Sequence, residues 1–289
     1  MKHLEGKRIA LVGSAGMLAF AFKKLLPESV DLLELDLPAF DLTDSEQVSR
    51  ELGAFSPDVV VNCAAFTNVD GCESEEELAT KVNGLGVGLL AEASRKLGAV
   101  FVHVSTDYVF SGDKTEPYCE EDTTGPRSAY GRSKLCGEQA LIKSGLASYF
   151  IVRTSWLYGP GGNNFVETIR RLASEREQLK IVADQVGTPT FTPDLAGAIL
   201  NLLATDAYGI YHFSNAGKCS WCDFANEIVR LLRVSGEQLL VKEILPIKTE
   251  EYPLPATRPA YSVFSKDKYV SVTGAKVPDW KEALSRYLG

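Results

Sequence analysis

Residues 10–19 read "ALVGSAGMLA" and decide the fold of this 289-residue chain. An apolar run ends at Gly13 and Gly16, and a helical pattern begins directly after the second glycine. The backbone N–H groups of such a turn, together with the positive end of the helix, can hold a pyrophosphate. The spacing is GxxGxxA, and alanine is tolerated at the third position, here Ala19. The stretch predicts a strand, a nucleotide-binding turn and a helix.

Apolar runs of strand length alternate with helical patterns from this turn through the first half of the chain. The runs are "RIALVG", "VDLLELD", "PDVVVNCAA", "AVFVHVST" and "SYFIVRTS", and a long amphipathic stretch covers residues 75–97. Several runs are apolar at consecutive positions, which is typical of strands covered on both faces. The pattern predicts an α/β chain with a Rossmann-type, doubly wound parallel sheet.

The rhythm loosens after Tyr158. A glycine-rich "GPGGNN" precedes a helical pattern over residues 165–176, and "GTPTFTP" and "YPLPATRP" interrupt the remainder. A mixture of this kind after a nucleotide-type half predicts a smaller C-terminal lobe that closes over a ligand. We expect residues 1–158 to be mainly the NAD(P)-binding domain and residues 159–289 mainly the substrate-binding lobe, with the two interleaved.

Composition and charge exclude several classes of protein. The formal net charge is −8, and no basic run is longer than two residues, which argues against nucleic-acid partners and against a polybasic membrane surface. The start of the chain has neither the long apolar region nor the cleavage site of a signal peptide, so we expect a cytoplasmic protein without a membrane segment.

The cysteines indicate reduced thiols rather than a disulfide framework, because a chain of this length does not need covalent staples. They are Cys63, Cys72, Cys119, Cys136, Cys219 and Cys222. The last two form a CxxC, but there is no second pair and the chain has 3 histidines. We therefore interpret that pair as incidental and expect no metal site.

The second predicted strand ends at Asp36, about twenty residues beyond Gly16, where an acid can bind the ribose hydroxyls of adenosine. The segment "LPAFDLTD" that follows has no basic residue to receive a 2′-phosphate. We expect NADH to be used at least as well as NADPH. The alternative is a solvated acid at the end of a strand.

Tyr130 and Lys134 stand four residues apart in "AYGRSKLCGE", residues 129–138. On a helix they share one face, and a nearby positive charge is expected to lower the pKa of a phenol from about 10 toward neutrality. Thr106 follows the fourth predicted strand in "STDYVF", at the sheet edge where ligands bind. Its hydroxyl can reach the same carbonyl that the tyrosine protonates. The alternatives are a partly buried tyrosine, a solvated lysine and a threonine that bonds to backbone.

The glycine turn, the strand end with hydroxyl groups and the YxxxK pair together resemble the extended branch of the short-chain dehydrogenase/reductase superfamily. Further segments resemble the dTDP-4-dehydrorhamnose reductase family, in the same order along nearly the whole chain. They include "VVVNCAAFTNVDGCESE", "VHVSTDYVFSG", "RTSWLYGPGGNNF", "ADQVGTPTF", "GIYHFSN" and "ATRP". The combination is far more specific than YxxxK alone.

The resemblance implies a role for individual residues. Tyr130 would be the acid, Lys134 would bind the nicotinamide ribose, and Thr106 would complete the catalytic group. The other cofactor contacts would be Gly13, Gly16, Met17, Leu18, Asp41, Leu42, Ala64, Ala65 and Thr67, in addition to Asp36 from the strand pattern. The sugar nucleotide would be met by Thr106, Asp107, Tyr130, Trp156, Asn163, Gln185 and Arg258. Trp156 as an ordinary core anchor stays an alternative.

The implied reaction is NAD(P)H-dependent reduction of the C4 ketone of dTDP-4-dehydro-β-L-rhamnose to dTDP-β-L-rhamnose, and a homodimer is possible. A nucleotide-sugar epimerase or dehydratase of the same branch is the second interpretation. A dehydratase typically carries an Asp-Glu pair after the threonine, whereas Asp107 is followed by Tyr108 here. A third interpretation is a non-catalytic, NADP-binding regulatory subunit similar to the β subunit of methionine adenosyltransferase.

Overall fold

Six parallel strands form the central sheet in the order β2-β1-β3-β4-β5-β10. The computed structural model of the chain describes residues 2–289. The strands are β1 (Arg8–Val12), β2 (Asp31–Leu35), β3 (Val59–Asn62), β4 (Val100–Thr106), β5 (Tyr149–Thr154) and β10 (Gly209–His212). Ala10 of β1 pairs with Leu33 of β2 on one side and with Val60 of β3 on the other. The strand order therefore reverses at β1, and the crevice beyond the carboxyl ends of β1 and β3 is the position where such sheets bind ligands.

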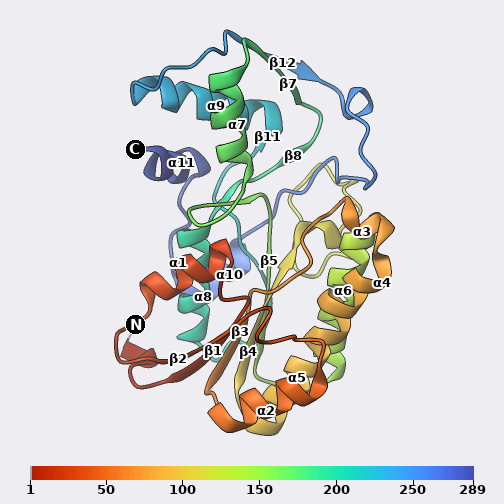
Figure 1. Cartoon of the computed structure of the whole chain (residues 1–289), viewed down its shortest axis with the longest axis vertical. Coiled ribbons are helices and arrows are strands. Elements are labelled where there is room, and N and C mark those ends of the chain that lie inside the picture. The colour runs from red at the N-terminus through yellow and green to blue at the C-terminus, as the bar shows by residue number, and fades with distance from the viewer. Residues whose placement is uncertain (1) are drawn as a thin grey trace.

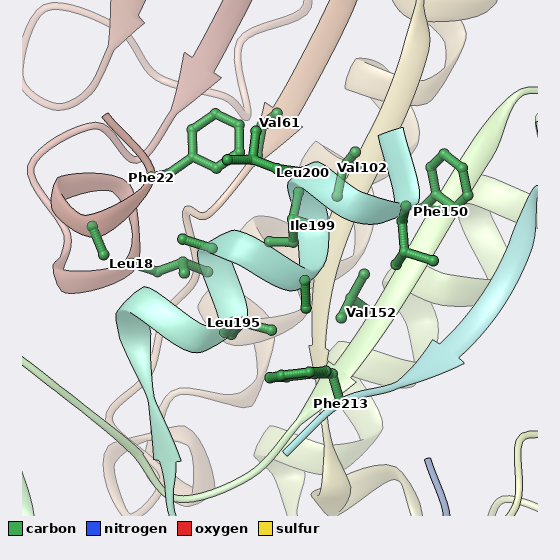
Figure 2. Packing of buried hydrophobic residues seen from close by; sticks show 14 of the residues in the cluster. Leu18, Phe22, Val61, Val102, Phe150, Val152, Leu195, Ile199, Leu200 and Phe213 are labelled. Atoms are coloured by element: carbon green, nitrogen blue, oxygen red, sulfur yellow. The ribbon is translucent and has the colours of Figure 1, made fainter. Parts of the chain in front are cut away.

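Helices cover both faces of the sheet, which explains the consecutive apolar positions of its strands (Figure 1). α1 (Met17–Leu25), α8 (Thr192–Leu203) and α10 (Asp267–Thr273) lie on one side, and α2 (Ser45–Phe55), α5 (Gly86–Leu97) and α6 (Ala129–Lys143) lie on the other. Figure 2 shows Phe22 of α1 and Ile199 of α8 among Val61, Val102 and Val152 of the strands. The predicted doubly wound parallel architecture is confirmed.

The long amphipathic stretch of residues 75–97 is not a regular α-helix throughout, because a π-helical turn interrupts it. It is divided into α4 (Glu76–Thr80), a π-helical turn η2 (Lys81–Leu85) and α5, after the short α3 (Gly71–Ser74). Asn83 in the π-helical turn is fully buried, accepts a hydrogen bond from Phe66 N at 2.8 Å and donates to Ser133 Oγ of α6 at 3.0 Å. A π-helical turn often marks a functional site in a helix. Here its residue Asn83 bonds to α6 and holds that helix in position.

A smaller lobe stands above the carboxyl edge of the sheet (Figure 1). Its helices are α7 (Phe165–Glu175), α9 (Trp221–Val234) and α11 (Trp280–Leu288). Short strand pairs complete it: β7 (Gln178–Val182) with β12 (Glu243–Ile247), β8 (Val186–Gly187) with β11 (Cys219–Ser220), and β6 (Leu157–Tyr158) with β9 (Thr190–Phe191). Its own core holds Tyr158, Phe224 and Trp280.

The two halves of the sequence interleave. β10 and α8 come from the second half, yet β10 pairs with β5 at the edge of the sheet and α8 packs beside α1. Residues 192–212 therefore belong with the central sheet and its helices. A functional boundary after residue 158 stays a prediction. No helix in residues 2–289 combines the length and apolar character that crossing a bilayer requires.

Candidate active site

A cavity of about 910 Å³ opens at the carboxyl ends of β1, β3, β4 and β5. It brings together most of the residues predicted from the sequence, although they come from widely separated segments. These are Gly13, Gly16, Met17, Leu18, Asp36, Asp41, Leu42, Ala64, Ala65, Thr67, Thr106, Asp107, Tyr130, Lys134, Trp156 and Asn163. Another hollow of about 980 Å³, over α9, contains none of them.

The glycine turn forms one end of the cavity. Gly13 has φ +77°, and a Cβ atom there would lie 2.5 Å from the backbone nitrogen of Ala64. Gly13 is therefore required both by its backbone conformation and by the close approach of β3. Gly16 caps α1 without a side-chain hydrogen bond, so the first N–H groups of that helix stay available for an anion. This end fits the pyrophosphate of a dinucleotide.

Asp36 stands beside that turn, at the end of β2. Its Oδ2 accepts a hydrogen bond from Ala15 N at 2.7 Å, and its Oδ1 accepts one from Leu37 N at 2.8 Å. The carboxylate is thus held at the place where the ribose of adenosine is expected. Among the described residues that line the cavity, Lys134 is the one basic side chain, and it belongs to the opposite end.

The other end of the cavity holds the hydroxyl groups. Ser128 caps α6 by accepting a hydrogen bond from Gly131 N at 3.1 Å, which places Tyr130 in the first turn and Lys134 in the second. Thr106 ends β4, and its Oγ1 donates to Asp107 Oδ1 at 3.1 Å. The ring of Tyr130 meets the ring of Tyr108, in η3 (Asp107–Val109), edge-on with a centroid distance of 5.4 Å. Tyr130, Thr106 and Lys134 therefore line the same cavity.

The expected lowering of the Tyr130 pKa is wrong for this structure. Burial raises the pKa of Tyr130, the charge of Asp107 adds to the rise, and contact with Thr106 acts in the opposite direction. The Nζ atom of Lys134 donates to Val104 O at 2.7 Å, and burial lowers the pKa of Lys134 to about 8. Desolvation is thus the largest cause of the pKa shift of both groups. The phenol stays protonated at neutral pH, which is the state that a proton donor needs.

Glycine at position 131 decides how close α6 comes to η3. A Cβ atom there would lie 2.2 Å from Tyr108 O and 2.9 Å from Pro126 Cβ. We expect Gly131→Ala to reduce the free energy of unfolding by about 1–3 kcal/mol and to lower turnover, because α6 and Tyr130 must shift. Urea denaturation measures the first effect.

Gly53→Ala is the matched control for that substitution. Gly53 lies in α2, and a Cβ atom there would meet nothing within 4 Å. Alanine should be neutral or stabilise the helix by up to about 1 kcal/mol. A Gly131→Ala protein as stable as the wild type would show that α6 can move away from η3 without cost.

An aromatic wall faces the substrate end, and part of it was missed by the sequence analysis. Trp156 lies in the left-handed region at φ 47°, and its indole stacks on that of Trp221 with a centroid distance of 3.5 Å and an interplanar angle of 9°. Phe165 packs on Trp221 at 4.6 Å, and all three residues line the cavity. Trp221 belongs to α9 of the other lobe, so no local pattern links it to Trp156.

Two predicted substrate residues lie outside the cavity lining. Gln185 is buried and donates from Nε2 to Thr249 Oγ1 at 3.0 Å. Arg258 forms a bidentate ion pair with Asp70, with both N···O distances 2.7 Å. Their contacts with a sugar nucleotide stay predictions. Cys219 and Cys222 are buried free thiols, and within residues 2–289 no group of three metal-binding side chains is found.

The doubly wound sheet, the glycine turn at its switch point and a cavity lined by Thr106, Tyr130 and Lys134 define an extended short-chain dehydrogenase/reductase. The sequence model of the family described as "RmlD substrate binding domain" matches residues 7–289. The chain belongs to this family.

Relatives agree with this assignment over nearly the whole chain. The chain is 42% identical to the spore coat polysaccharide biosynthesis protein SpsK of Bacillus subtilis, covering 97% of this chain and 96% of the relative. It is also 42% identical to a dTDP-4-dehydrorhamnose reductase of Sinorhizobium fredii, with 96% of each chain covered. A crystal structure of dTDP-4-dehydrorhamnose reductase from Bacillus anthracis in complex with NADP is 41% identical and has a TM-score of 0.91, with 97% of this chain and 98% of that chain covered.

Proposed function

We propose that this protein is a reductase that uses NADPH or NADH to convert dTDP-4-dehydro-β-L-rhamnose to dTDP-β-L-rhamnose. The observation that carries the proposal is that Thr106, Tyr130 and Lys134 line one cavity together with the Gly13 turn. A relative that is 42% identical and named dTDP-4-dehydrorhamnose reductase supplies the substrate class. The name of the Bacillus subtilis relative supports a place in polysaccharide synthesis.

The residues of the site divide the reduction between them. When bound, the reduced nicotinamide supplies a hydride to C4 of the sugar. Tyr130 donates its phenolic proton to the ketone oxygen as the C–H bond forms, so no free alkoxide accumulates. Thr106 bonds to the same oxygen and orients it, while Lys134 holds a ribose hydroxyl and returns a proton to Tyr130. Trp156 packs against the sugar and keeps water away from the reacting carbon.

The experiment that tests this function is the loss of nicotinamide absorbance when the purified protein meets dTDP-4-dehydro-L-rhamnose. NADH and NADPH are supplied separately, and the product is identified by mass. We expect one nicotinamide to be consumed for each sugar reduced. An epimerase or a dehydratase would convert its sugar without net consumption. Binding of cofactor without any turnover would move the assignment to another sugar substrate or to a non-catalytic regulatory subunit.

The position of Asp36 predicts the cofactor preference. Its carboxylate, fixed by Ala15 N, would face the 2′-phosphate of NADPH without a compensating cation. We expect KM for NADH to be no higher than KM for NADPH. Asp36→Asn should lower KM for NADPH about fivefold relative to NADH, because it removes one repulsion of roughly 1 kcal/mol. A wild-type KM for NADPH tenfold below that for NADH would contradict the prediction.

The proposal extends to the setting of the reaction. A cytoplasmic setting is part of the proposal, and the net charge of −8 supports a protein without nucleic-acid or membrane-surface partners. The family resemblance suggests a homodimer, which light scattering on the purified protein would test.

A further inference from the structure

His103 lies directly behind the catalytic lysine and has no part in the mechanism above. It is fully buried in β4, between the end of β3 and the face of α6. Its Nδ1 lies 3.2 Å from Asn62 Nδ2, and its Nε2 lies 3.4 Å from Lys134 Nζ. The ring thus connects a backbone-anchored amide to the amino group of the active site.

Asn62 determines which ring nitrogen carries the hydrogen. Ala64 N donates to Asn62 Oδ1 at 3.0 Å, which fixes the orientation of the amide and turns its NH₂ group toward the ring. His103 Nδ1 must therefore accept a hydrogen bond. Burial lowers the pKa of His103 well below its ordinary value, so the ring is neutral. The single ring hydrogen is consequently on Nε2, and it is directed at Lys134.

An N–H donor in this position distinguishes the two states of Lys134. An ammonium group has donors and no acceptor, so it gains nothing from the Nε2–H, whereas the neutral amine accepts a hydrogen bond from it. Val104 O, at 2.7 Å, receives an N–H from either state. The neighbours of Nζ therefore offer hydrogen bonds to the neutral amine of Lys134.

Glu138 and Cys63 are the other titratable groups near the amino group of Lys134. Glu138, one turn further along α6, favours the charged state of the lysine. Cys63, after β3, is a neutral thiol, because burial raises its pKa to about 12. Glu138 is bound by Arg153 of β5, with Nη2 to Oε2 at 2.7 Å, and accepts a hydrogen bond from Ser105 Oγ at 2.6 Å. Its effect on the lysine is thereby reduced, because much of its charge is compensated.

We propose that His103 is a positioning residue that makes Lys134 a stronger acid during turnover. This inference rests on the proposed function. After Tyr130 has given its proton to the sugar, an N–H bond of the Lys134 ammonium breaks and the O–H bond of Tyr130 re-forms, directly or through a ligand hydroxyl. The amine that remains accepts the Nε2–H of His103, and a proton from solvent then restores the ammonium.

The tautomer is measured first, on the wild-type protein with ¹⁵N-labelled histidine and no substrate. Only three histidines are present, which keeps the long-range ¹H–¹⁵N spectrum simple. His212 is an internal control, since its Nδ1 lies 3.0 Å from Tyr118 O and its Nε2 faces Arg153 at 3.4 Å. We expect the hydrogen of His103 on Nε2 and that of His212 on Nδ1. A His103 that carries its hydrogen on Nδ1, or on both nitrogens, would overturn the proposal whatever the substrate is.

The second measurement is the pH dependence of kcat/KM for His103→Gln. The amide of glutamine can turn its oxygen toward Lys134 and accept from the ammonium, so the basic limb should move up by about one pH unit. His212→Gln, a buried substitution of the same kind, should leave that limb in place. An unmoved limb in a folded His103→Gln protein would reject the role of His103, whereas absence of turnover in the wild type would reject the proposed function alone.

Discussion

Tyr130→Phe is expected to lower turnover by about a hundred- to ten-thousandfold, which is the usual contribution of a general acid. The substitution removes the phenolic proton but keeps the ring that packs edge-on against Tyr108. Cofactor binding should therefore persist, because the glycine turn and Lys134 are unchanged. The loss of nicotinamide absorbance over time gives the rate, and titration of the protein with NADH gives the binding constant.

Tyr208→Phe serves as the control for this substitution. Tyr208 is 37% exposed and stands beside Phe150, outside the cavity lining, so removal of its hydroxyl should leave turnover unchanged. A Tyr130→Phe protein that kept more than half of the wild-type rate would refute the role of the phenol.

In the wild type, the charge on Lys134 is lost as the pH rises through its pKa of about 8, so activity should decline above that pH.

Arg153→Met is expected to reduce the free energy of unfolding by about 3–5 kcal/mol, the cost of leaving one member of a buried ion pair alone. The side chains of Arg153 and Glu138 are only 3% and 2% exposed. Their bonds are bidentate, with Nε to Oε1 at 2.9 Å and Nη2 to Oε2 at 2.7 Å. Without the guanidinium, the carboxylate of Glu138 would keep the hydroxyl of Ser105 as a hydrogen-bond partner and would lose its ion-pair partner.

Two further proteins make that experiment decisive. Arg153→Met combined with Glu138→Gln should recover part of the lost stability, because the unpaired charge is removed. Arg132→Met breaks the pair with Glu76 on the exposed side of the same helix, at 2.7 Å, and should cost at most about 1 kcal/mol. Equal denaturation midpoints for Arg153→Met and Arg132→Met would show that burial does not set the value of the inner pair.

Local chemistry was enough to predict the glycine turn and the positions of Tyr130 and Lys134, whereas most of the other cavity residues were predicted from the family resemblance. Gly13 and Gly16 stand at a strand-to-helix turn, and the apolar runs around them specify covered parallel strands, so the cavity at the switch point follows from topology. The four-residue spacing of Tyr130 and Lys134 places both on one face of α6. These features depend on neighbours within a few residues, and for that reason the pattern of the sequence contains them.

Other features depend on contacts between distant segments, and only the tertiary structure decided them. The stack of Trp156 on Trp221, the pairing of Arg258 with Asp70 and the bond between Asn62 and His103 each join separate elements. The continuous helical pattern of residues 75–97 gives way to a π-helical turn because Asn83 bonds to Phe66 and Ser133.

The sequence by itself determined the doubly wound sheet, its glycine turn and the placement of Tyr130 and Lys134 on one face of α6. The tertiary structure decided their electrostatics: it raised the pKa of Tyr130, lowered that of Lys134 and turned Lys134 toward Val104 O. The physical reason is that helix and strand periodicity act within a few residues of the chain. Desolvation is instead the sum of all the atoms that several elements bring around one charge, and no local pattern specifies that sum.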